Sequence, residues 1–423
     1  MTTGPDDAAE PAPRPLFTQR NFAALWGGQL ISILGERLTY MALVGLIAVH
    51  TSTFDDLASS TLLLALLLNV MLAPVLIFAP FTGPWVDRWD LKRVMIVSDA
   101  LRGLVVVFMP LAYAATHHMG PVLVLVFVLF TCNVFFLPAK SAITPELVPR
   151  SQLLVANALL SGAGIASTGI GMLLGGWIID HWGWAVALYV NAATYLVSVV
   201  SLALIRYAGH PQHEPLPEIS VRNYLGEVRE GWGLIRRNAT VALGLLTLGA
   251  VWGAGGFVHV AGNPHIQRAA CVPGAERLGA LMFVLGVGAG LGTWWVNGPG
   301  RRVARHLLLA GGLFLAAVGL VALAVTTRFA VFSVAAFLIG IAAAPMFVLS
   351  ETLLQLGTEP RQRGRVFSAR DFLMRLVFLV GGTVAGFLTR AAGTRAALLV
   401  CAAIVALAGL AAVTWRMERE HPA

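Results

Sequence analysis

Long apolar stretches dominate the hydrophobic pattern of this chain, and each is long enough to cross a membrane as a helix. About 20 apolar residues span the hydrocarbon core of a bilayer in helical form. By that measure, six runs precede a polar stretch at residues 206–237 and six follow it. The predicted spans are Phe22–His50, Ala58–Thr82, Val94–Ala115, Pro121–Ala142, Leu153–Ile179, Trp184–Ile205, Ala239–Ala261, Leu278–Asn297, Leu307–Thr326, Phe329–Leu354, Val366–Thr389 and Ala396–Trp415.

The overall composition is typical of a protein that lies mostly in lipid. Of the 423 residues, 57% are hydrophobic and 12% are charged, and the mean hydropathy is +0.78. Soluble domains carry roughly a quarter charged residues, so a soluble fold and a disordered chain are both excluded. The three cysteines are an odd number and predict no disulfide framework. We therefore expect an all-α membrane protein with twelve transmembrane helices.

Positive charge lies in the gaps between the apolar runs and does not form one basic patch. The formal net charge is +8, but its dispersal excludes nucleic acid as a partner. Of the 29 Lys and Arg residues, 20 fall in the tails and in gaps on the side where the chain starts. Five fall in the opposite gaps, and four lie within the runs. Positive residues accumulate on the inside, which predicts a multi-pass protein of the plasma (inner) membrane with both termini cytoplasmic. The scarcity of lysine is typical of a GC-rich bacterial genome.

The two halves of the chain repeat each other, as they do in transporters that work by alternating access. Gly83-Pro84 and Gly298-Pro299 both precede clustered basic residues and lie 215 positions apart. Between the halves, apolar residues recur every three or four positions from 221 to 235, which predicts an amphipathic helix on the membrane surface. The expected organisation is a disordered tail (1–21), a first bundle (22–206), a linker containing this helix (207–238), a second bundle (239–416) and a tail (417–423).

Three motifs carry a resemblance to a known family. The run GPWVDRWDLKR at 83–93 resembles the signature G-x-x-x-D-R-x-x-R-R of the major facilitator superfamily. The runs QLISILGERL at 29–38 and PAKSAITPELVP at 138–149 are similar to the drug:proton antiporter branch that includes macrolide efflux pumps and enterobactin exporters. The resemblance covers essentially the whole chain. It implies two six-helix bundles that export an amphipathic organic solute, such as a drug or a siderophore, in exchange for protons. One departure is Met172, because antiporters usually carry proline there.

The resemblance also implies a cytoplasmic gate. It places Asp87 against the amino end of the eleventh helix, where the helix dipole favours an anion. Arg88, Lys92 and Arg93 would bridge the cytoplasmic face and hold the outward-open state. Gly83 opens the motif, and positive-inside topology alone does not explain the ordered positions of Gly83 and Asp87.

Glu36 is the candidate proton-coupling residue. It lies about 20 Å along the first helix, near mid-membrane, where a charge costs about 2.5 to 3.5 kcal/mol. An acid there can bind or release a proton as the cavity opens to each side. Gln29, Ser32, Glu36 and Tyr40 recur at intervals of three and four, which predicts that one helix face presents all four to the cavity. Arg37 is expected to point elsewhere. The alternative is that Glu36 is a structural ion-pair member.

Other polar and aromatic residues within the spans are weaker candidates. Asn69 and Asn133 are expected at the cavity, because amides at that depth need partners. Trp252 is a candidate aromatic wall, although packing and lipid contact are commoner uses of such rings. Alternate glycines at 286–292 predict close contact between the eighth and fifth helices.

Two intramembrane charge pairs are predicted from their spacing. Asp99 and Arg102 stand one turn apart, and so do Asp371 and Arg375. Each pair can neutralise itself and steady a helix end, and a gating role is the alternative. Glu351 is expected to pair with Arg370 or Arg375.

Motifs for catalysis and for cofactor binding are missing from the sequence. It contains no phosphate-binding G-x-x-x-x-G-K-[ST], no H-E-x-x-H, no C-x-x-C and no G-x-G-x-x-G. We therefore expect no enzyme activity, no cofactor and no metal, and an ion or solute gradient as the energy source. The expected partners are a small amphipathic molecule, protons and membrane lipid, and a monomer would suffice. The alternatives are a facilitator of the same fold and a lysophospholipid-flipping or sensor protein.

Overall fold

A computed structural model describes residues 15–51, 57–86, 89–149, 152–207, 238–269, 275–356 and 363–415, together with isolated linker positions. The tails expected at 1–21 and 417–423 lie outside these residues, apart from 15–21, and so does most of the linker with its amphipathic helix. Within the described ranges the backbone is helical and the connections are short. The predicted all-α fold is confirmed.

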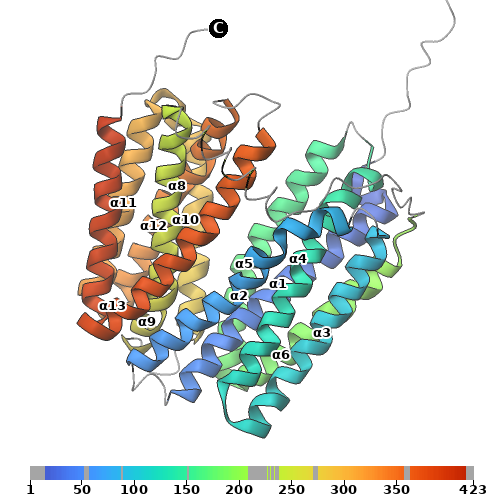
Figure 1. Ribbon diagram of the computed structural model, residues 1–423. Coiled ribbons are helices and arrows are strands. Elements are labelled where there is room, and N and C mark those ends of the chain that lie inside the picture. Colours follow the sequence, from blue (N-terminus) through green and yellow to red (C-terminus); the bar gives the residue numbers. More distant parts are fainter. Residues whose placement is uncertain are drawn as a thin grey trace, which may run out of the picture.

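The helices form two bundles (Figure 1). The first bundle contains α1 (Arg20–His50), α2 (Leu57–Val86), α3 (Leu91–Thr116), α4 (Met119–Leu147), α5 (Leu153–Trp182) and α6 (Trp184–Ala203), preceded by the short turn η1 (Leu16–Thr18). The second bundle contains α8 (Ala239–Phe257), the π-helical turn η3 (Val258–Gly262), α9 (Asn263–Ala269), α10 (Ala275–Asn297), the turn η4 (Pro299–Arg302), α11 (Arg305–Val325), α12 (Phe329–Leu356) and α13 (Arg363–Thr414).

The last helix, α13, contains two crossings of the membrane. Gly393 breaks it with φ 85° and ψ 161°, a conformation that glycine adopts without the strain a side chain would cause. Among the described residues, eleven helices are long and apolar enough to span a bilayer, and α13 is one of them. With α13 counted as two, the predicted twelve-helix architecture is confirmed.

The described chain begins and ends on the same face of the molecule, which we call the terminal face. Asn21 Nδ2 donates to the carbonyl of Arg206 at 2.9 Å, which joins the start of α1 to the end of α6. Trp415 Nε1 donates to the carbonyl of Ala239 at 2.8 Å, which joins the end of α13 to the start of α8. The last residues of α1, α3 and α5 lie at the other end of the helices, which we call the opposite face.

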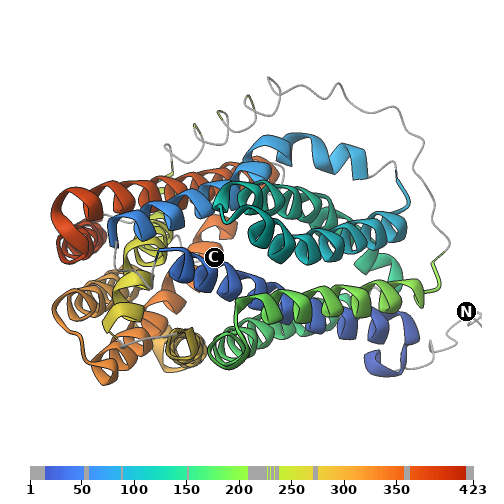
Figure 2. The same cartoon turned by 90° about the horizontal axis from the view of Figure 1, so that it is seen from below.

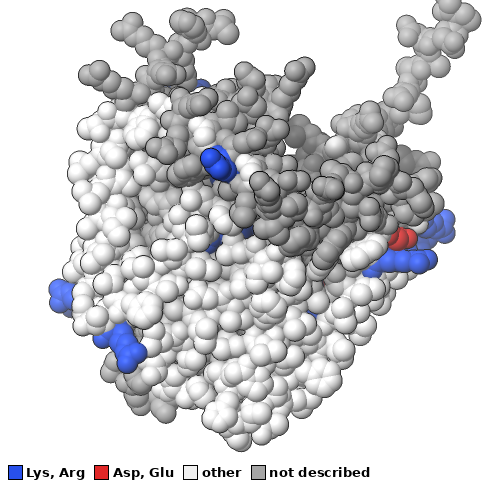
Figure 3. Space-filling view, in the orientation of Figure 1, with Lys and Arg blue, Asp and Glu red and all other residues white. Residues whose placement is uncertain are grey.

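The outer surface is suited to lipid. In Figure 3 the middle of the visible face is almost free of charged side chains. Large apolar residues point outward, including Leu196 at 65% and Trp294 at 67% exposure. Exposure of such side chains in a helical bundle matches a hydrocarbon environment, where the backbone is already satisfied within the helices.

The two bundles meet along two helix pairs, α5 with α10 and α2 with α13 (Figures 1 and 2). Gly279 lets α10 approach α5 closely, because a Cβ there would clash with the backbone of Met172. The expected meeting of these two helices is therefore found, but the glycines at 286–292 do not all face it. A side chain at Gly288 or Gly292 would instead meet the backbone of α12 at Ile341.

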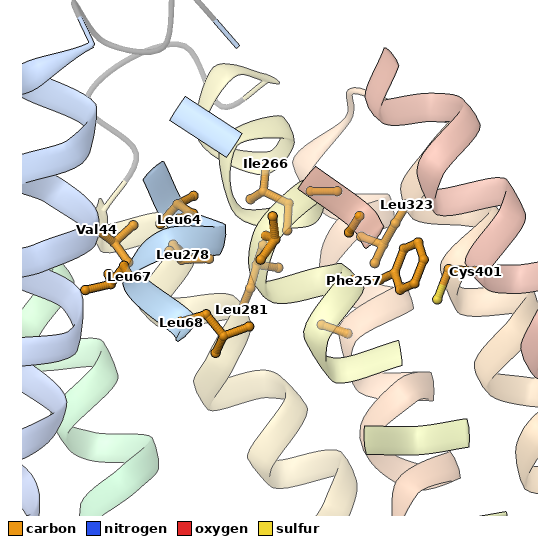
Figure 4. Close-up of a cluster of buried hydrophobic side chains, with 14 of the residues drawn as sticks. Val44, Leu64, Leu67, Leu68, Phe257, Ile266, Leu278, Leu281, Leu323 and Cys401 are labelled. Carbon is orange, nitrogen blue, oxygen red and sulfur yellow. The ribbon is translucent and has the colours of Figure 1, made fainter. Parts of the chain in front are cut away.

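An apolar seal closes the half of the molecule near the opposite face. Figure 4 shows buried side chains of both bundles in one cluster, with Val44 and Leu64 from the first bundle and Leu278 and Leu281 from the second. All four are at most 1% exposed. These residues lie towards the ends of α1, α2 and α10 at the opposite face, so the bundles are packed together there.

Hydrogen bonds across the same half support this closure. Tyr40 of α1 accepts from Asn263 Nδ2 at 2.9 Å and lies 3.0 Å from His259 Nδ1. The Tyr40 hydroxyl can accept from Asn263 and at the same time donate its own proton to His259 Nδ1. Asp180 Oδ2 accepts from the backbone N–H of Glu276 at 2.8 Å and so caps the amino end of α10. This conformation is therefore closed at the opposite face.

Candidate substrate and proton site

A cavity of about 530 Å³ lies at mid-depth between the bundles. Pockets of roughly 300 to 1,000 Å³ hold drug-sized molecules, so this one is large enough for an organic solute. Its walls come from α1, α4 and α5 of the first bundle and from α10 of the second. The lining residues are Gln29, Ile33, Glu36, Arg37, Asn133, Phe136, Leu137, Lys140, Gly164, Thr168, Gly169, Met172, Met282, Leu285 and Gly286.

The two walls of this cavity differ in chemistry. The second bundle contributes Met282, Leu285 and Gly286, which offer only an apolar surface. The charged and amide side chains all come from the first bundle. These polar residues are Gln29, Glu36, Arg37, Asn133 and Lys140. An amphipathic molecule would therefore direct its polar end towards α1 and α4.

Glu36 lies at the junction of this cavity with a smaller one of about 160 Å³, and it lines both. Its side chain is 29% exposed, and its Oε1 accepts from Arg102 Nη1 at 2.6 Å. No hydrogen bond to Oε2 is found among the described residues. In this conformation Glu36 is therefore an ion-pair member, as in the alternative interpretation, and it still has one oxygen available to the cavity.

Arg102 is the centre of a buried charge cluster. Its side chain is 1% exposed and also pairs through Nη2 with Asp99 Oδ1, whose side chain is fully buried. Ser198 of α6 donates to the second oxygen of Asp99 at 2.6 Å. The predicted Asp99–Arg102 pair is present, but it does more than steady one helix. Two carboxylates share one guanidinium, so Arg102 alone cannot neutralise both.

The same guanidinium joins four helices. Arg102 Nη1 also donates to Asn133 Oδ1 of α4 at 3.2 Å. The guanidinium lies 4.4 Å from the ring centre of Phe136 and 4.8 Å from that of Tyr195, within the range of cation–π attraction. Asn133 is thus found at the cavity, as expected, with its acceptor atom occupied. The cluster fixes the position of Glu36 relative to α3, α4 and α6.

Arg37 does not point away from the cavity, so that expectation is wrong. It lines both cavities, and its stem packs over α5, with its Cβ 2.9 Å from the position of a Cβ at Gly171. The cavity follows a wide arc of α1, so neighbouring residues 36 and 37 both reach it despite their different angles on the helix. Among the described residues, Arg37 Nε has no acceptor.

Comparison with known proteins identifies the family. A sequence profile of the Major Facilitator Superfamily matches residues 25–303 and 277–423, which together cover most of the chain. The chain belongs to the Major Facilitator Superfamily. It is therefore a multi-pass membrane transporter for small molecules, and it is not an enzyme.

Relatives and solved structures agree with this assignment. A protein described as a putative bacilysin exporter of Bacillus subtilis is 28% identical, with 84% of this chain and 85% of that protein covered. Macrolide efflux protein A of Streptococcus pyogenes is 24% identical, with coverage of 91% and 94%. A bacterial homologue of the human lysosomal transporter Spinster, in an inward-facing and occupied conformation, has the same fold. Its TM-score is 0.71 at 15% identity, covering 97% of this chain and 100% of that one.

The remaining cavity candidates occupy other places in this superfamily fold. Tyr40 lines the smaller cavity and bonds to the second bundle. Asn69 accepts from Thr383 Oγ1 at 3.2 Å, so it joins α2 to α13. Trp252 packs edge-on against two phenylalanine rings of the second bundle. Ser32 is buried, 2% exposed, and is not among the residues that line the two cavities.

Residues of α5 also line the cavity. Gly164 and Thr168 lie on the cavity wall one turn apart. Met172, which replaces the proline usual in antiporters of the superfamily, lies one further turn along the same face. The three-and-four spacing of these residues was the available signal, because it places all of them on one side of the helix.

The signature motif of the superfamily is only partly within the described residues. Gly83 lies in the last turn of α2, whereas Asp87 and Arg88 lie outside the described residues. Lys92 Nζ donates to the carbonyls of Ala203 and Ile205, at 2.9 and 2.7 Å. In this conformation, which is closed at the opposite face, Lys92 therefore satisfies the carboxyl end of α6 within its own bundle. The bridge expected of the motif belongs to the outward-open state and stays a prediction.

Arg93 also acts within the first bundle. It lies 3.7 Å from the carboxylate of Asp90, and its side chain is 85% exposed. Asp90 is the cap of α3, because its side chain accepts from the backbone N–H of Arg93 at 3.0 Å. An exposed pair of this kind contributes little, so the main role of Asp90 is to start the helix.

The predicted Asp371–Arg375 pair is not found. Asp371 instead accepts from its neighbour Arg370, at 3.0 Å from Nε and 2.8 Å from Nη2. The side chain of Glu351 lies outside the described residues, so its expected pairing with Arg370 or Arg375 stays a prediction.

Proposed function

We propose that this protein exports an amphipathic organic solute, of the drug or siderophore kind, across the bacterial plasma membrane in exchange for protons. Two relatives that cover most of the chain are described as an efflux protein and an exporter. A mid-depth cavity with one polar wall and one apolar wall suits an amphipathic cargo. Binding at the midplane between two repeats is the arrangement that alternating access requires.

The direction of transport follows from the orientation that we assign. The tails and gaps at the terminal face hold 20 Lys and Arg residues against 5 in the opposite gaps, so we place the terminal face in the cytoplasm. The apolar seal and the Tyr40 hydrogen bonds then lie on the outer side. In this conformation the solute would enter the cavity from the cytoplasm.

Glu36 carries the coupling step, and its position is the observation on which the proposal rests. Arg102 holds Oε1 and is itself held by Asp99, whereas Oε2 has no partner among the described residues. A proton or a donor group of the solute can occupy that free oxygen, but both cannot. Because the two ligands compete for one carboxylate, each favours release of the other, and exchange results.

One proton supplies enough energy for such a cycle. At 100 mV and one pH unit, an entering proton provides about 2.3 + 1.4, or roughly 3.7 kcal/mol. That corresponds to roughly 500-fold accumulation of a neutral solute on the outer side. A single coupling acid therefore suffices.

A facilitator of the same fold is the second candidate. It is favoured by the ion pair between Glu36 and Arg102, and by Met172 in place of the antiporter proline. In this version Glu36 stays ionised throughout the cycle, and the solute moves along its own gradient.

Glu36→Gln distinguishes the two candidates. Proteoliposomes containing the full-length protein would be loaded with a macrolide, a siderophore or a lysolipid, and efflux would be measured with and without external acidification. Glu276→Gln is the matched control, because its side chain is exposed at the start of α10. We expect acid outside to accelerate efflux by the wild type and the control. The Glu36→Gln variant should lose this response but keep solute–solute exchange.

Two results would contradict parts of this proposal. If Glu36→Gln still responds to the imposed pH gradient, the coupling acid is another residue. If the wild type transports the solute but ignores the gradient, the protein is a facilitator.

A further inference from the structure

Three hydrogen-bond donors on the first-bundle wall of the cavity have no protein acceptor among the described residues. Gln29 is 3% exposed, and its Nε2 is buried without an acceptor. Arg37 Nε is buried in the same condition, and the Lys140 ammonium lines the same cavity with no acceptor found. A buried donor left unsatisfied is costly, and in native proteins it usually has a reason, such as a ligand.

The acceptors on the same wall are largely occupied. Arg102 uses both Asn133 Oδ1 and Glu36 Oε1. The first-bundle wall therefore presents two cations and an amide donor to the cavity, but only one carboxylate oxygen without a partner among the described residues. Once the Asp99–Arg102 pair is set aside as neutral, the formal charges of Arg37, Lys140 and Glu36 sum to +1.

We propose that the cavity recognises a carboxylate of its solute, through Arg37, Lys140 and Gln29. This inference rests on the proposed function and names its substrate class. Glu36 and Arg37 are neighbours of opposite charge on α1, so together they match an amine and a carboxylate that stand close together on one molecule. The solute is then a zwitterionic amphiphile, with an amino-acid-like head on the first bundle and an apolar body against α10. A planar guanidinium is well suited to a carboxylate, because it can donate two parallel hydrogen bonds.

Simpler solutes fit the wall less well. A solute with only a positive charge would face Arg37 and Lys140, and it would gain only the carboxylate oxygen that Arg102 leaves free. A neutral solute could offer acceptors to the two cations but no negative charge to compensate them. A solute with only a carboxylate satisfies the donors but leaves Glu36 unused.

Three fluorescent probes with the same ring system and nearly the same chain separate these cases. Nε-dansyl-lysine carries an amine and a carboxylate, 6-(dansylamino)hexanoic acid carries the carboxylate alone, and dansylcadaverine carries the amine alone. Binding to the purified full-length protein would be followed by dansyl fluorescence. Because the dansyl ring is the same and the chain nearly so in all three probes, differences in affinity report the contribution of the charged head group.

The expected order of affinity has the zwitterion tightest and dansylcadaverine weakest. Loss of the charge-assisted hydrogen bonds should weaken binding roughly 10- to 100-fold. Arg37→Gln and Lys140→Gln should each remove most of the preference for the two carboxylate probes without weakening dansylcadaverine. Arg37→Lys should keep part of the preference, and it serves as the test if Arg37→Gln does not fold. Arg328→Gln, on the exposed opposite face, is the matched charge control and should change nothing.

The pH dependence separates this inference from the proposed function. Charged and titratable groups near Glu36 come from α1, α3, α4 and α6, whereas α5 and α10 add none to the cavity lining. These groups are Arg37, Tyr40, Asp99, Arg102, Lys140 and Tyr195. Protonation of Glu36 removes a negative charge, so falling pH should weaken the two amine probes by competition. The hexanoic acid probe should bind as well or more tightly, until it is itself protonated.

The outcomes that overturn the carboxylate assignment are definite. They are equal affinity for the three probes, tighter binding of dansylcadaverine, no binding of either carboxylate probe, or a preference that survives both glutamine variants. If instead the carboxylate preference holds but acid does not weaken the amine probes, proton competition at Glu36 fails and the substrate class stands.

Discussion

Replacement of Arg102 by methionine tests the buried charge cluster at its centre. The guanidinium is 1% exposed, and it compensates Asp99, whose side chain is fully buried. In Arg102→Met, the hydroxyl of Ser198, at 2.6 Å, would be the one side-chain partner of Asp99 left among the described residues. Methionine fills much of the same space, so the main loss is electrostatic and not a cavity.

The size of the effect follows from this geometry. Removal of one partner of a buried ion pair costs about 3 to 5 kcal/mol, because it leaves an uncompensated charge in a low dielectric. A unit of 150 to 250 residues changes its Tm by about 2 to 4 °C per kcal/mol. For a bundle of this size we expect Tm to fall by about 6 to 20 °C. Addition of Asp99→Asn should restore much of that loss, because it removes the unpaired charge that is fully buried, whereas the side chain of Glu36 is 29% exposed.

The assay is thermal unfolding of purified protein in detergent, reported by a thiol-reactive dye at buried cysteines such as Cys401. A double-mutant cycle of Asp99→Asn and Arg102→Met isolates the pairwise contribution. Arg93→Met is the matched control, because that side chain is 85% exposed. A fall in Tm below about 3 °C for Arg102→Met, or additive effects in the cycle, would refute the reasoning.

Further predictions concern closure of the opposite face and helix ends. Gly279→Val should prevent α10 from packing on α5 and shift the protein towards opening at the opposite face, whereas Gly290→Val, with nothing near its Cβ position, should not. Spin-label distances across that face would report this, and an unchanged distance would contradict it. By the same measurement, Tyr40→Phe should weaken closure by about 1 kcal/mol per lost hydrogen bond, roughly a fivefold shift. Lys92→Ala should lower Tm by about 2 to 4 °C for about 1 kcal/mol of lost capping, and Arg93→Ala should lower it far less.

The hydrophobic runs predict the fold well because the bilayer sets both the length and the polarity of each span. Even so, α2 extends to Val86, beyond the predicted end at Thr82, since its last turn leaves the hydrocarbon region and the apolar pattern gives no signal there. The break at Gly393 falls in the sequence gap between the last two apolar runs. Glycine suits this position because its positive φ would strain a residue with a side chain. Local pattern and membrane thickness therefore suffice for the architecture.

The candidate site depends on contacts that local pattern does not contain. The Asp99–Arg102 pair is predictable because both residues lie one turn apart on α3. The bond from Arg102 to Glu36 joins residues 66 positions apart, and only the tertiary arrangement, in which α1 and α3 both pack on α6, creates it. The angle of Arg37 on α1 predicts that it points away from the cavity, but the cavity curves far enough around that helix to reach it. The sequence therefore predicts how deep each charged residue lies in the membrane, but it does not predict the residue with which it pairs.

Proton release on solute binding tests the central claim that a proton and the solute compete for Glu36. Nε-dansyl-lysine would be added to purified wild-type protein in weakly buffered solution, at pH values from mildly alkaline to mildly acidic, with a pH indicator present. The account predicts that binding releases up to about one proton per probe at the acidic end, and that Glu36→Gln releases none. Binding by the wild type without proton release, or with proton uptake, would contradict it.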